Sequence, residues 1–95
     1  MPTSQELIHK ATVLLDLKQD AVSAQATLLE AVAAAASPVD KVQAKVFLAE
    51  LLVTLDRARE ARTLFESALE DAKEVEEADL VGDEVLRANV FLAKS

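Results

Sequence analysis

The chain has 95 residues, of which 52% are hydrophobic but only 3% aromatic, and its net charge is −7. This length corresponds to one domain, and the hydrophobic content is too high for a disordered chain. The acidic balance argues against nucleic-acid binding, because phosphate backbones require a basic surface. The sequence contains no cysteine, which excludes disulfides, thiol catalysis and thiolate metal sites.

The sequence carries no signal for export or membrane insertion. Its N-terminus lacks a basic stretch followed by an apolar run, so no secretory signal is predicted. The uncharged stretch from Ala31 to Val39 is too short and too rich in alanine to span a bilayer. We therefore predict a cytoplasmic protein without membrane contact.

The first half of the chain contains three helix-start signals. Thr3 and Glu6 form a capping-box pattern, Asp20 follows a short polar turn, and Ser37 precedes Pro38. One glycine and two prolines leave little material for tight turns, which favours long helices with short connections. These signals predict helices over about residues 4–17, 21–36 and 38–55.

The third of these helices is apolar on two sides. Leu48 and Leu52 lie on one side, and Val42 and Val46 lie on another. The first and fourth predicted helices instead show the three-to-four spacing of a single apolar face. The third helix is therefore expected to lie between neighbouring helices.

The second half of the chain predicts two more helices. Asp56 is expected to end the third helix, and a fourth is expected over about residues 57–77. Gly82 is the only glycine and predicts a helix stop, while Asp83 offers a fresh N-cap. A fifth helix is expected over about residues 84–94.

Internal repeats connect these helices. The string from Val46 to Ala49 returns 44 positions later, from Val90 to Ala93. Repeats with periods of this size are typical of stacked helical units that bury their apolar faces against one another. A second set of similar residues is displaced by 37 positions. It consists of Leu14-Leu15, Ala24, Leu28 and Ala31, which correspond in order to Leu51-Leu52, Ala61, Phe65 and Ala68.

The pattern of small and apolar residues resembles the tetratricopeptide repeat, a helix–turn–helix unit with small residues where its helices cross. The family's usual proline near the end of the second helix is missing in the second unit, and the 44-residue spacing resembles longer-helix variants found in bacterial regulatory and scaffold proteins. The resemblance implies an all-α array of antiparallel helix–turn–helix repeats, with unit one over about 4–36, unit two over about 38–77 and a terminal helix over about 83–94. The matching positions are Ile8, Ala11, Thr12, Leu15, Ala24, Leu28 and Ala31 in unit one, and Leu48, Ala49, Leu52, Ala61, Phe65 and Ala68 in unit two.

In this family the first helices of the units line a concave groove in which a peptide or helix docks. The resemblance therefore implies a partner-binding groove built by the first, third and fifth helices. Phe47 and Phe91 are its unusual members, and two interpretations stay open: they face the groove, or they turn sideways into the core. The predicted groove residues are Glu6, His9, Lys10, Val13, Gln43, Phe47, Glu50, Thr54, Arg87 and Phe91.

The end of the fourth predicted helix is strongly acidic. Seven carboxylates lie between Glu66 and Asp79, although the helix dipole disfavours negative charge at a C-terminus. A solvated outer face is the favoured interpretation, and a platform for a basic partner is the alternative. The segment from Glu74 to Gly82 is expected to fray.

No catalytic, metal or cofactor site is predicted. His9 is the only histidine, and no residue accompanies it at the spacing of a metal site or a catalytic triad. The chain also lacks a phosphate-binding glycine loop, a calcium loop and a nucleophile elbow. Enzyme activity is therefore not expected.

The fifth predicted helix is unusually apolar for a terminal element, because terminal repeats normally carry a polar outer face. Val85, Leu86, Val90 and Leu92 are candidates to contact a second copy of the chain or a partner helix. We predict a non-catalytic protein–protein interaction module. Two alternatives stay open: a self-associating module that forms homodimers, and a chaperone-like regulatory subunit that binds apolar segments.

Overall fold

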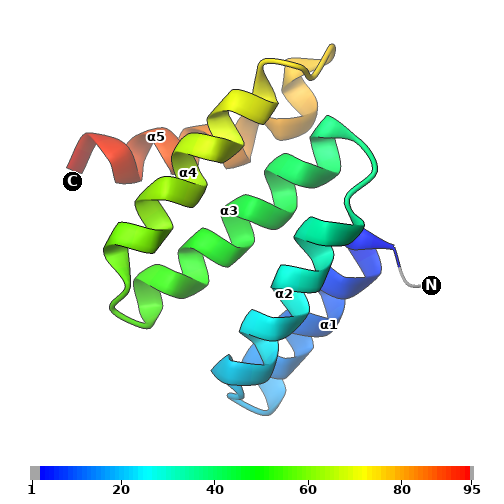
Figure 1. The fold of residues 1–95 in the computed structure, drawn as a ribbon, viewed down its shortest axis with the longest axis vertical. Coiled ribbons are helices and arrows are strands. Elements are labelled where there is room, and N and C mark those ends of the chain that lie inside the picture. Colours follow the sequence, from blue (N-terminus) through cyan, green and yellow to red (C-terminus); the bar gives the residue numbers. More distant parts are fainter. Residues whose placement is uncertain (1–2, 95) are drawn as a thin grey trace.

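The computed structural model describes residues 3–94, and these residues form helices and contain no strand. The predicted all-α fold with five helices is confirmed (Figure 1). One additional short 3₁₀ helix, η1, precedes the last helix. The elements in chain order are α1 (Ser4–Leu17), α2 (Ala21–Ala34), α3 (Pro38–Thr54), α4 (Ala58–Ala72), η1 (Ala78–Val81) and α5 (Gly82–Lys94).

The helices form two antiparallel hairpins and a final helix. α1 packs on α2 and α3 packs on α4, and these are the two most extensive helix contacts of the structure. α2 joins the hairpins by packing on α3, and α5 packs on α4 and on α3. In Figure 1, α1 lies behind α2 and α5 lies behind α4. The extents of 34 × 33 × 18 Å correspond to a slab about two helices thick.

The three predicted helix starts are confirmed. Thr3 Oγ1 accepts a hydrogen bond from the Glu6 N–H at 3.2 Å, and Asp20 Oδ1 accepts one from the Ser23 N–H at 3.0 Å. Ser37 Oγ accepts a hydrogen bond from the Asp40 N–H at 3.2 Å. Each cap satisfies a backbone donor that has no partner within its own helix.

Several helix ends differ from those predicted from the sequence. α2 ends at Ala34, two residues before the predicted end, and Ala35 is extended with a ψ of 120°. Asp56 ends α3 as predicted, with a left-handed φ of 63°. Gly82 does not stop a helix: its φ is −56°, and it is the first residue of α5.

α4 is shorter than predicted and ends at Ala72 instead of at residue 77. The chain then turns through residues 73–77 and re-enters the core at Val81, which is buried at the end of η1. A straight continuation of α4 would carry Val81 away from the core, so burial of this side chain favours the turn. The fraying expected from Glu74 to Gly82 stays a prediction.

The core consists mainly of alanine and leucine side chains, with a few valines, Ile8 and Phe65. α3 contributes seven buried residues from both of its sides, as its two apolar faces predicted. Some repeat-related positions are buried alike, such as Ala24 with Ala61 and Leu28 with Phe65. Others differ: Val46 is buried whereas Val90 is exposed. Alanine at a crossing lets two helix backbones approach closely, and both hairpins bury alanine in this way.

Polar side chains also connect the elements. Lys45 of α3 donates to Asp71 Oδ2 at 2.5 Å and to Ser67 Oγ at 2.8 Å, both on α4. Arg57, in the turn between α3 and α4, donates to Gln25 Oε1 of α2 at 3.0 Å. These contacts hold the second hairpin together and attach it to the first.

Candidate interaction groove

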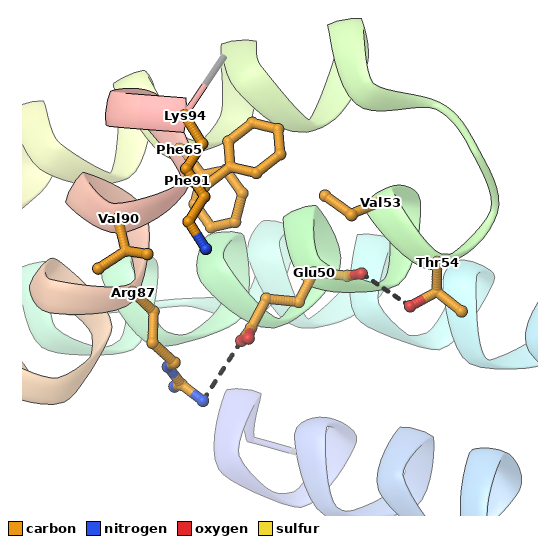
Figure 2. A pocket seen from close by; sticks show the side chains of 8 residues that line it. All are labelled: Glu50, Val53, Thr54, Phe65, Arg87, Val90, Phe91 and Lys94. Atoms are coloured by element: carbon orange, nitrogen blue, oxygen red, sulfur yellow. Dashed lines mark hydrogen bonds and ion pairs between the residues drawn. The ribbon is translucent and has the colours of Figure 1, made fainter.

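Two adjoining hollows lie along α3 on the side of α1 and α5, and together we call them the groove. The first has a volume of about 390 Å³ and lies between α3, α4 and α5 (Figure 2). The second has a volume of about 360 Å³ and lies between α1, α2, α3 and α5. They share Glu50, Thr54 and Arg87, so the groove continues from α5 to α1. Its other lining residues are Val53, Phe65, Val90, Phe91 and Lys94 in the first hollow, and Ala11, Thr12, Leu15, Leu28, Phe47 and Leu51 in the second.

The periodicity of α3 places three of its groove residues on one side of the helix. Phe47, Glu50 and Thr54 follow one another at three- and four-residue intervals, which is one stripe of an α-helix. Thr54 donates its hydroxyl hydrogen to the Glu50 carbonyl at 3.2 Å in the last turn of α3. The stripe predicted from sequence therefore lines the groove, with the exception of Gln43.

An ion pair crosses the boundary between the two hollows. Arg87 Nη1 of α5 lies 3.3 Å from Glu50 Oε1 of α3, as Figure 2 shows. The same guanidinium group lies over the Phe47 ring, 5.6 Å from its centroid. Arg87 thus connects α5 to α3 by a charge contact and a cation–π contact.

Partial burial changes the acidity of Glu50. Desolvation raises the pKa of this carboxyl above its ordinary value of 4.5. The positive charge of Arg87 acts in the opposite direction, and the negative charge of Glu84 adds to the increase. The groove therefore lowers the stability of the ionised form of Glu50 relative to an exposed carboxylate.

Both open interpretations of the phenylalanines describe part of the structure. Phe47 and Phe91 are half-buried: each packs against the core and each lines the groove. The Phe91 ring lies 4.8 Å from the ring of the fully buried Phe65. One face of Phe91 is therefore held by the core while another side forms the groove wall.

α1 reaches the groove with residues other than those predicted. Ala11, Thr12 and Leu15 line the second hollow. The predicted Glu6, His9, Lys10 and Val13 do not line either hollow; the first three are exposed and Val13 is half-buried. The prediction failed because α1 is rotated about its axis so that its apolar side, and not the side of His9, faces the neighbouring helices. The sequence contained one indication of this arrangement: Thr12 is a polar residue directly beside the apolar side of α1, as expected for a residue at the edge of a groove.

Gln43 also lies outside the two hollows. Its side-chain oxygen accepts a hydrogen bond from Gln5 Nε2 of α1, and the same Gln5 group donates to Asp40 Oδ1 at 3.0 Å. Gln43 therefore belongs to a polar contact between the start of α1 and the start of α3. Sequence reasoning also missed Val53 and Phe65, which line the first hollow from α3 and α4.

The four residues predicted to contact a second copy divide between two sides of α5. Leu86 is 62% exposed and Val90 is 45% exposed, so both lie on the outer side. Val85 and Leu92 are half-buried and pack against the core. Val85 and Leu92 are therefore core residues, and only Leu86 and Val90 belong to the outer side.

The acidic run at the end of α4 does not form one uniform surface. Asp71 points inwards and pairs with Lys45 of α3. Glu70 pairs with Lys73 at 3.1 Å on the exposed side. Glu74 to Asp79 lies in the exposed turn and the start of η1, apart from the half-buried Val75. These contacts favour the solvated face over a dedicated acidic platform.

Comparisons with known proteins give no further guide to the groove. A scan against family models, a search of curated proteins and a search of solved structures found no significant match. Within residues 3–94, no helix combines the length and the apolar character needed to cross a membrane. The same residues bring together no group of three or more His, Asp or Glu side chains able to hold a metal ion.

Proposed function

We propose that the chain is a non-catalytic interaction module that holds an extended or helical segment of another protein in the groove. The observation that carries the proposal is the continuity of the groove across α1, α3 and α5. Its two hollows share Glu50, Thr54 and Arg87, and half-buried phenylalanines line both of them. Concave, mainly apolar surfaces with a few placed polar groups are typical of ligand and peptide sites.

The groove chemistry supports a partner segment with apolar side chains. Phe47 and Leu15 line the second hollow, and Val53, Val90 and Phe91 line the first. Burying these half-exposed surfaces against aliphatic or aromatic side chains contributes about 25 cal/mol per Å² of apolar area. The charged groups in the boundary are already paired with each other, so an apolar segment leaves Glu50 and Arg87 satisfied.

The two hairpins also support a repeat of the tetratricopeptide kind, because equivalent alanines are buried in each of them. On this proposal α5 is the first helix of a further unit. The cytoplasmic location stays a prediction, which fractionation of cells expressing a tagged chain tests.

The test of the groove uses exposed rim residues, because Phe47 and Phe91 also support the core. A displayed library of random peptides is selected on the immobilised wild-type protein, and the enriched peptides are titrated by calorimetry. Val53 is 40% exposed at the rim, so Val53→Asp is expected to weaken binding at least about tenfold by placing a charge beside the buried peptide.

The matched control is Val22→Asp. Val22 is 81% exposed on α2 and does not line either hollow, so this variant carries the same chemical change outside the groove. It is expected to bind the peptides as the wild type does, and circular dichroism checks that both variants keep their helices. Equal binding by Val53→Asp and the wild type would show that the peptides bind elsewhere and would refute the proposal.

A further inference from the structure

The outer side of α5 carries a stripe of four exposed residues in a definite order. Asp83, Leu86, Val90 and Lys94 follow one another at intervals of three, four and four residues, which places them on one side of the helix. The opposite side holds the fully buried Ala88, which packs into the core. The stripe therefore reads acidic, apolar, apolar, basic along about 16 Å of helix.

This order makes the stripe complementary to itself in one orientation. When two such helices pack antiparallel, Leu86 of one copy meets Val90 of the other, and Asp83 of one meets Lys94 of the other. Parallel packing would instead place Asp83 beside Asp83 and Lys94 beside Lys94, where like charges repel. We propose that a second copy of this chain docks on α5, antiparallel and around a two-fold axis.

The charges at the two ends of the stripe are the reason for proposing a second copy of this chain as the occupant. Each copy carries a net charge of −7, so two copies repel each other overall. Local pairing of Asp83 with Lys94, repeated twice by the symmetry, offsets this repulsion where the apolar residues meet. A two-fold contact uses the same patch on both copies, which is the commonest arrangement of small homo-oligomers.

The proposed dimer shares residues with the groove. Val90 and Lys94 line the first hollow and also belong to the α5 stripe. Docking of a second copy therefore covers part of the groove wall, and dimer formation competes with segment binding. The dimer itself does not depend on the groove's function, so the two proposals can fail separately.

The first test is sedimentation velocity over a range of protein concentrations. The wild type is expected to show a reversible monomer–dimer equilibrium. Leu86→Asp is expected to raise the dissociation constant at least about tenfold, because it places a carboxylate in both symmetric apolar contacts. Leu86 lines neither hollow of the groove but borders a neighbouring hollow with Phe47 and Arg87, so this variant should weaken peptide binding less than it weakens the dimer.

Val22→Asp is the control here as well, because it adds the same charge at another exposed position, on α2. Its dimer equilibrium should differ little from that of the wild type. A wild-type protein that sediments as a monomer at every concentration would overturn the proposal. Equal weakening by Leu86→Asp and Val22→Asp would overturn it too, because net charge alone would then explain the effect.

The second test separates local pairing from net charge by reversing the end charges. Asp83→Lys changes the net charge from −7 to −5, and Lys94→Asp changes it from −7 to −9. If overall repulsion governed association, the first variant would associate more tightly and the second more weakly. Antiparallel pairing predicts that both variants associate more weakly, because each one places two like-charged pairs in the contact.

The double variant restores both pairs with their signs exchanged and leaves the net charge at −7. It is therefore expected to recover the wild-type dissociation constant within about fivefold, which corresponds to the difference of about 1 kcal/mol between exposed ion pairs. An equimolar mixture of the two single variants should form heterodimers in preference to either homodimer. A double variant that associates no more tightly than the single variants would overturn the antiparallel contact.

Discussion

The contact between Phe65 and Phe91 connects the core to the groove wall, and it can be tested through stability. Phe65 is only 2% exposed, and its ring centroid lies 4.8 Å from that of Phe91. Replacing a buried phenylalanine with alanine costs about 3–5 kcal/mol, because apolar contacts are lost and a cavity remains. A domain of this size has a total free energy of unfolding of about 5–15 kcal/mol. Phe65→Ala should therefore remove a large part of the stability.

The assay is urea unfolding followed by circular dichroism at the helix band. The urea concentration at the midpoint of unfolding should fall, while the dependence of the free energy of unfolding on urea concentration stays the same. This pattern indicates a change in stability and not in the surface exposed on unfolding. Phe91 is half-buried, so Phe91→Ala should cost about half as much as Phe65→Ala, about 1.5–2.5 kcal/mol. Leu28 occupies the position equivalent to Phe65 in the first hairpin, and Leu28→Ala should cost about 2–5 kcal/mol.

A double-mutant cycle isolates the ring contact itself. Phe65→Leu and Phe91→Leu keep most of the apolar volume but remove the aromatic pair, and their coupling should be about 0.5–1.5 kcal/mol. The control pairs Phe65→Leu with Phe47→Leu, since the Phe47 ring faces the Arg87 guanidinium group. That pair should couple by less than about 0.5 kcal/mol. Equal coupling in both cycles, or a cost below about 1 kcal/mol for Phe65→Ala, would refute this account of the groove wall.

Three further predictions concern charged groups. The Lys45 and Asp71 side chains are only 17% and 19% exposed, so Lys45→Ala should cost about 1–3 kcal/mol by urea unfolding, against less than about 0.5 kcal/mol for the exposed Lys73→Ala. Hydrogen bonds from the Ser23 backbone and side chain lower the pKa of Asp20 below 3.8. The ionised Asp20 carboxylate therefore stabilises the fold above pH 3.8, and this stabilisation is lost as the pH falls through the lowered pKa. The stability difference between the wild type and Asp20→Asn should accordingly be larger at pH 6 than at pH 2. The raised pKa of Glu50 has the opposite effect on the pH dependence of stability. Its favourable contribution is present below pH 4.5 and is lost as the pH rises through the raised pKa. Glu50→Gln should therefore be more stable relative to the wild type at pH 7 than at pH 3.

Local signals determined where most helices begin. Thr3, Asp20 and Ser37 could be recognised because an N-cap depends on a side chain and a backbone donor only three residues away. Helix ends were less accessible to this reasoning. α4 stops at Ala72 because Val81 must return to the core, and this constraint lies nine residues beyond the end of the helix.

The sequence by itself determined the all-α class, the buried position of α3 and the stripe of Phe47, Glu50 and Thr54, because each follows from the period of one helix. Only the tertiary structure decided how α1 is rotated about its axis, and hence that Ala11, Thr12 and Leu15 line the groove while His9 does not. It also decided which residues of α5 face outwards, leaving Leu86 exposed and Val85 against the core. The physical reason is that periodicity fixes which residues share a face, whereas the neighbour that covers this face depends on packing between segments distant in the chain.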